Sequence, residues 1–121
     1  MRLRRGSVTG TNPFTTHGNL LVDIKGGTGF SNSVSLQTGD FQAAADASAV
    51  ATMSAANANG DLSSGALNAT GRGLINKTGK TQFRVYFTLD DNDNTSADYI
   101  GWFSGNDATA ANRPVLEITY Q

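Results

Sequence analysis

The chain has 121 residues, which favours one domain with a core of moderate size. Its net charge of −1 argues against nucleic acid as a partner, because no strong basic surface is available to hold phosphates. It has no cysteine, which excludes a disulfide framework, a thiolate metal site and a cysteine nucleophile. A charged fraction of 16% together with 14 glycines is typical of a β-protein with many turns.

The first five residues, Met1-Arg2-Leu3-Arg4-Arg5, are basic, but the stretch that follows them is polar. This pattern predicts no signal peptide, since an apolar segment would have to follow the basic one. No stretch of the sequence is apolar for long enough to span a bilayer, so no membrane span is expected. Leu3 between two arginines indicates the end of a strand with the leucine facing inward.

Residues 19–25 have the period-two pattern of a strand. Leu20, Val22 and Ile24 share one face, and polar side chains take the other. A pair of glycines ends this strand, and residues 50–54 indicate a weaker one.

Two short helices are expected in the connections. The first covers residues 38–45, with Asp40 as its N-cap ahead of three alanines. The second covers residues 67–76, with Asn68 as its N-cap. Residues 55–64 between them are interpreted as a polar loop.

The clearest strand lies within residues 80–89. Its apolar side chains alternate with polar ones, which predicts one buried and one wet face. The inward residues are Phe83, Val85, Phe87 and Leu89, and the outward ones are Gln82, Arg84, Tyr86 and Thr88.

Two further strands are predicted near the carboxyl end, at residues 99–103 and 114–120. In the last one, Leu116, Ile118 and Tyr120 would face the core, and Glu117 and Thr119 the solvent. Five to seven short strands with one or two short helices favour a sandwich over an α/β sheet. The sequence therefore predicts an all-β, jelly-roll-like antiparallel β-sandwich, with residues 1–121 forming a single domain.

The acidic loop between the strands at residues 80–89 and 99–103 is a candidate calcium site, because hard oxygen ligands at short spacing suit Ca²⁺. Its candidate ligands are Asp90, Asp91, Asp93 and Asp98. The loop is not an EF-hand, since counting from Asp90 places Thr95 where glycine is needed and Gly101 where glutamate is needed. The alternative is a solvated loop in which Asp and Asn form turns.

Aromatic side chains that can stack on sugar rings are the second kind of candidate site. Tyr86 is on the polar face of its strand, beside Arg84, and Tyr99 begins the next strand. These three residues are the predicted ligand-binding residues, whereas Trp102 is expected in the core. An enzyme is not predicted, since no nucleophile–base pair or metal-bound water is indicated.

The carboxyl-terminal part resembles the last strands of the DNRLRE domain family, which is related to the disaggregatase-related repeats. The resemblance is carried by Ser104-Gly105-Asn106 and by residues 112–120, Asn-Arg-Pro-Val-Leu-Glu-Ile-Thr-Tyr. Residues 79–85, residues 90–93 and Leu3-Arg4-Arg5 also match the style of the family. Asn106 departs from the acidic residue that is usual at its position.

The resemblance implies a jelly-roll module of a large secreted or cell-surface protein. Some family members bind carbohydrate, and others are wall or adhesion modules. It therefore implies an extracellular, non-catalytic module that binds carbohydrate or a cell-surface polysaccharide. The alternative is a structural subunit of a surface layer or filament, assembled by strand pairing between chains.

In that family, a Leu-Arg-Leu strand lies well inside the domain, whereas its counterpart here is at Leu3. The resemblance thus implies that residues 1–121 are the carboxyl-terminal three-quarters of a full module. Such a module would have an open sheet edge, and open edges invite pairing with another chain. We expect self-association, either through a strand donated by a neighbouring subunit or through edge-to-edge dimerisation.

Overall fold

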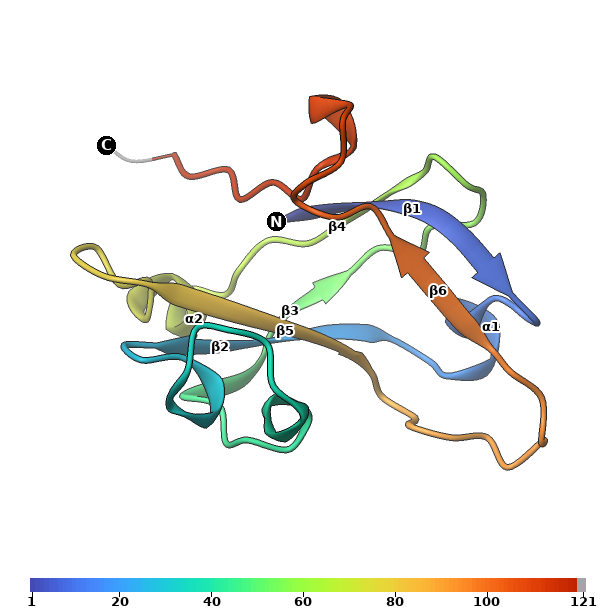
Figure 1. Ribbon diagram of the computed structural model, residues 1–121, viewed down its shortest axis with the longest axis horizontal. Coiled ribbons are helices and arrows are strands. Elements are labelled where there is room, and N and C mark those ends of the chain that lie inside the picture. Colours follow the sequence, from blue (N-terminus) through green and yellow to red (C-terminus); the bar gives the residue numbers. More distant parts are fainter. Residues whose placement is uncertain (120–121) are drawn as a thin grey trace.

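The computed structural model describes residues 1–119, which form two antiparallel three-stranded sheets (Figure 1). One sheet has the order β4-β1-β6 and the other the order β3-β2-β5. The fold is therefore all-β and sandwich-like, as the sequence predicts. The strands are β1 (Arg2–Thr9), β2 (Leu20–Gly26), β3 (Ala47–Met53), β4 (Leu62–Ser64), β5 (Thr81–Phe87) and β6 (Tyr99–Trp102).

The helical elements are short and lie in the connections. Within residues 1–119, none of them has the length and apolarity that a bilayer crossing requires. They are α1 (Pro13–Thr16), α2 (Ala69–Gly73) and the 3₁₀ turns η1 (Phe30–Asn32), η2 (Thr38–Phe41) and η3 (Ala110–Asn112).

The core lies between the two sheets and is centred on β2. Leu20, Val22 and Ile24 are each at most 1% exposed, so the predicted inward face of this strand is confirmed. Leu3 from β1 and Met53 from β3 belong to the same buried cluster. The burial of these apolar side chains away from water is the main contribution that stabilises the packing of the two sheets.

Strand β5 forms as predicted and pairs with β2 over seven consecutive residues, from Leu20↔Phe87 to Gly26↔Thr81. Phe83, Val85 and Phe87 pack against the core cluster but are only partly buried. β5 is the outermost strand of its sheet, so one flank of the strand has no neighbouring strand. Every residue of β5 is consequently half-buried, and the expected contrast between its two faces is weak.

The prediction for residues 114–120 is wrong where the structure describes them. This segment pairs with β1 only at Arg2↔Val115 and otherwise forms no strand. Leu116 is 39% exposed and Ile118 54% exposed, although core positions were expected for both. The cause is the missing neighbour: past Val115 the segment runs beyond the start of β1 (Figure 1). Tyr120 lies outside the described residues.

Leu89 is a second correction, because it is 44% exposed rather than buried. The strand ends at Phe87, and Leu89 already belongs to the loop that follows it. The predicted exposure of Thr88, Glu117 and Thr119 is confirmed.

The connections were predicted less well than the strands. Asn68 caps α2 as expected, with its side chain accepting a hydrogen bond from the Gly71 N–H. Asp40 is not an N-cap: it lies inside η2, where its carboxylate accepts from the Gln37 N–H. The predicted loop at residues 55–64 contains β4, a strand too short to give a sequence pattern.

Candidate functional site

A groove of about 820 Å³ is lined by residues of both sheets. Val85, Tyr86 and Phe87 line it from β5, and Ile100 and Trp102 line it from β6. These strands belong to different sheets and are joined by residues 88–98 (Figure 1), and residues of both strands line the groove. The lining includes side chains from both faces of β5, and so the groove follows the outer flank of that strand.

Most of the residues that the sequence singles out meet at this groove. Arg84, Tyr86 and Tyr99 all line it, and so do Asp90 and Asp98. The structure thus gathers the three predicted ligand-binding residues and two of the four predicted calcium ligands around one space. Asp91 and Asp93 are not among the residues that line it.

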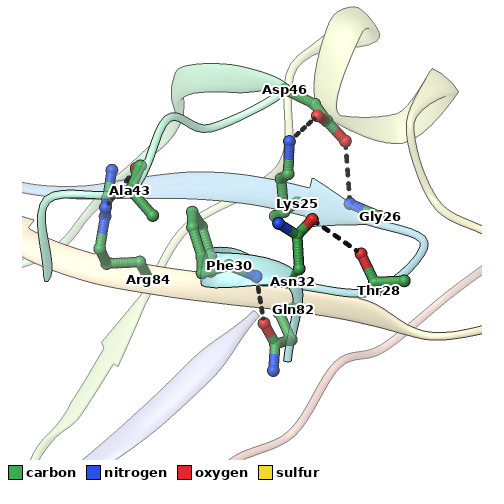
Figure 2. Close-up of polar contacts among 9 residues, drawn as sticks. All are labelled: Lys25, Gly26, Thr28, Phe30, Asn32, Ala43, Asp46, Gln82 and Arg84. Carbon is green, nitrogen blue, oxygen red and sulfur yellow. Dashed lines mark hydrogen bonds and ion pairs between the residues drawn. The ribbon is translucent and has the colours of Figure 1, made fainter. Parts of the chain in front are cut away.

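Arg84 is held by contacts within the chain. Its Nη2 donates to Asp23 Oδ2 at 2.5 Å, and its Nη1 donates to the carbonyls of Asp40 and Ala43. Its guanidinium also lies 4.7 Å from the centre of the Phe30 ring, within the range of a cation–π contact. Arg84 therefore ties residues 30–43 to the outer face of the β3-β2-β5 sheet, as Figure 2 shows in part.

Asp23 is the residue that sequence reasoning missed. It is 2% exposed, although it stands on the outer, polar side of β2. Its Oδ1 accepts the Ala49 N–H at the irregularity between β2 and β3, where Ala49 has a φ of 52°. The only signal in the sequence was a charged residue within an apolar run, because the register that places Asp23 directly opposite Arg84 is seen only in the structure.

The same connecting segment is fixed at two further points (Figure 2). Gln82 Oε1 accepts the Phe30 N–H, and Asp46 accepts from Lys25 Nζ and the Gly26 N–H. The hydrogen bond from Gly26, followed by that from Lys25, holds the pKa of Asp46 below its usual value. Residues 30–46 thus form a fixed cover on the outer face of the sheet.

The aromatic residues around the groove have different environments. Tyr99 is 58% exposed and Phe41 is 71% exposed, so both rings are available to a ligand. Tyr86 is half-buried, and burial, followed by the nearby Asp23 carboxylate, raises the pKa of its hydroxyl. Trp102 is only partly buried: it packs against the core cluster, as expected, but also lines the groove, and its ring centre lies 6.4 Å from that of Phe14 in an edge-to-face arrangement.

The acidic loop is organised by hydrogen bonds of its own. Asp98 accepts the Thr11 N–H at 2.7 Å and the side-chain amides of Asn92 and Asn94. These bonds, that from Thr11 foremost, hold the pKa of Asp98 below its usual value. They attach the loop to the residues that follow β1.

Among the described residues, no three acidic, histidine or cysteine side chains are gathered as a metal site. The amide nitrogens that face Asp98 are donors and do not suit a cation. Calcium binding by Asp90, Asp91, Asp93 and Asp98 therefore stays a prediction. Thermal melts with and without millimolar Ca²⁺ test it, because a ligand that binds only the folded state raises the melting temperature.

A comparison with known proteins gives no match: no family model, curated protein or solved structure matches this chain. The resemblance to the DNRLRE family accordingly stays a hypothesis. The functional argument rests on the groove and on the residues around it.

Proposed function

We propose that this domain is a non-catalytic module that binds an extended polysaccharide in the groove between β5 and β6. What supports the proposal is the placement of two exposed rings, Phe41 and Tyr99, on one open groove. Aromatic faces can contact the C–H groups of sugar rings, while a few polar groups in a partly apolar groove can fix the orientation of the ligand. An extracellular or cell-surface location belongs to the same proposal and comes from the family resemblance.

Polar groups for the sugar hydroxyls are present beside these rings. Ser48 and Asp90 line the groove and are exposed. Arg84 and Asp98 already have partners within the chain, so their main contribution is to hold the walls in place. Three carboxylates line the groove, but Asp23 is only 2% exposed and is paired with Arg84. The other two, Asp90 and Asp98, come from one loop rather than from opposite walls, which favours binding over glycoside hydrolysis.

Binding to a glycan array, followed by calorimetric titration with the best oligosaccharide, tests this proposal. We expect Tyr99→Ala to weaken binding by at least about tenfold, because stacking area is lost. Ile118→Ala is the matched control, because Ile118 is 54% exposed but does not line the groove. Equal affinities for the two variants, or no glycan bound at all, would contradict it.

A second function, a structural subunit that assembles by strand pairing between chains, is favoured by a different observation. The backbone of β5 lies along the groove with only one neighbouring strand. An extended partner chain can add to such an edge through main-chain hydrogen bonds. Light scattering over a wide range of protein concentration, without glycan, tests this function, and a strict monomer would exclude it.

A further inference from the structure

The free edge of β5 presents unpaired backbone groups at alternate residues. The Thr88 N–H donates to the Asn19 carbonyl, so the backbone of Thr88 points toward β2. The Ile24 carbonyl, opposite Phe83, instead accepts the Asp46 N–H on the β3 side. In an antiparallel pair, the backbone N–H and C=O groups of successive residues point alternately toward and away from the neighbouring strand. The N–H and C=O groups of Phe83, Val85 and Phe87 therefore point away from β2.

This edge lacks the features that usually prevent pairing. The strand has no proline, no glycine and no register irregularity against β2. Its only charge is Arg84, whose side chain is turned to Asp23 and does not guard the edge. Charged side chains, bulges and short length are the common protections of an edge strand.

The other outer strands do carry such protections. β3 has the irregularity opposite Asp23, and β4 is only three residues long. β6 is four residues long, and β1 pairs with it through a register shift. Among the strands that the structure describes, β5 is therefore the edge best suited to a partner strand.

Charges at the two ends of β5 indicate which partner fits. Lys77 and Lys80 precede the strand, and Asp90, Asp91 and Asp93 follow it. The strand is thus positive at its beginning and negative at its end. An identical strand laid antiparallel brings each positive end beside a negative one, so a second copy of the chain is electrostatically complementary.

We infer that two copies of this chain associate through β5, antiparallel and with twofold symmetry, into one continuous six-stranded sheet. The inference rests on the second proposed function, pairing between chains, and names its partner. A register centred on Val85 aligns Phe83 with Phe87 of the second copy, which joins the outward backbone groups identified above. The same register brings Lys80, just before β5, near Asp90 of the second copy, just after its β5.

Charge exchange at this pair gives the sharpest test. The wild-type chain should form a concentration-dependent dimer in sedimentation equilibrium. Lys80→Asp and Asp90→Lys should each weaken it by about tenfold, because two attractive pairs become repulsive. The double variant Lys80→Asp/Asp90→Lys should restore the wild-type affinity, whereas Glu117→Lys, a remote charge reversal, should leave it unchanged.

Cross-linking tests the register independently. Because the chain has no cysteine, a disulfide can form only between introduced residues. A mixture of Lys80→Cys and Asp90→Cys chains should form a covalent dimer, since the proposed register brings these two residues together at each end of the paired strands. Lys80→Cys alone should not, because its two copies would be about 33 Å apart.

The outcomes separate the inference from the function on which it rests. A strict monomer overturns both the inference and the function of pairing between chains. If the chain forms a dimer whose affinity is unchanged by the charge-exchange variants and which gives no mixed disulfide, pairing through β5 is wrong, but assembly between chains still holds. Polysaccharide binding is measured separately and is decided by Tyr99→Ala.

Discussion

Strands β2 and β5 are neighbours with similar apolar alternation, yet their burial differs. Val22 and Val85 lie directly opposite each other in the register, on the same inner face. Val22 is 0% exposed, whereas Val85 is only partly buried. β2 has a neighbouring strand on each side, whereas β5 has only one. The alternation of apolar residues therefore specifies which face of a strand points inward, and the number of neighbouring strands determines how deeply that face is buried.

The largest expected effect comes from Asp23→Ala, which removes the buried partner that joins the two strands. Arg84 would then keep its charge, 20% exposed, without a carboxylate. Losing one member of a buried pair costs about 3–5 kcal/mol of unfolding free energy, which chemical denaturation measures. Asp46→Ala, at the more exposed pair with Lys25, is the control and should cost much less. Equal losses of unfolding free energy in the two variants would mean that the buried pair of Asp23 and Arg84 contributes no more to stability than the exposed pair.

The valine pair tests the comparison directly. Val22→Ala should lower the unfolding free energy by about 2 kcal/mol, through lost burial and a cavity. Val85→Ala should lower it by about 1 kcal/mol, because that side chain is already partly in water. Urea denaturation at low protein concentration, where association is minimal, measures both. If the two losses are the same, the open flank of β5 does not matter to stability.

The same contrast shows what sequence could predict. Alternation correctly located β2 and β5, because apolar side chains recur at every second residue in both, and a short apolar segment located β6. It failed for Leu116 and Ile118, whose pattern is equally regular, because a pattern does not show whether a neighbouring strand exists. The groove residues Tyr86, Tyr99 and Asp90 were predicted as candidates by residue type.

Other parts of the site were not predictable from local patterns. The role of Asp23 depends on Ala49 and Arg84, which are far from it in sequence and meet it only in the sheet. Phe41 lies in a short 3₁₀ turn, and such turns have no strong periodicity. Its place beside the groove follows from the contacts of Arg84 with residues 40–43.

The loop that leaves β5 should give a pH-dependent effect. Because the pKa of Asp98 is lowered in the folded state, its hydrogen bonds stabilise the fold above the usual value of 3.8. This stabilisation should be lost progressively as the pH falls from 3.8 to below the lowered pKa of Asp98. Asp98→Asn should therefore flatten the acid side of the stability curve in denaturation experiments from pH 2 to 6. A curve with an unchanged slope would argue against the bond from Thr11.

The smallest effect is expected for Ile118→Ser in the segment after Val115. Ile118 is 54% exposed, and a surface substitution of this kind usually changes the unfolding free energy by no more than about 0.5 kcal/mol. Phe83→Ser, at an inward position of β5, is the comparison and should be clearly destabilising, since its ring packs against the core. Thermal and urea denaturation of both variants separate the two environments, and a large loss for Ile118→Ser would show that the segment packs onto the domain.

The pairing of Arg2 with Val115 has a mechanical consequence. The two residues exchange backbone hydrogen bonds of 2.8 and 3.0 Å, and the chain leaves this pair at the same side through Met1 and through residues 116–119 (Figure 1). A force that pulls these two ends apart therefore breaks the two hydrogen bonds one after the other. It does not load all the hydrogen bonds of a strand at once, as a force along the strand direction would. We expect the segment after Phe103 to peel away at low force while the β3-β2-β5 sheet stays folded. Single-molecule pulling would record this as an early, small extension before the main unfolding event.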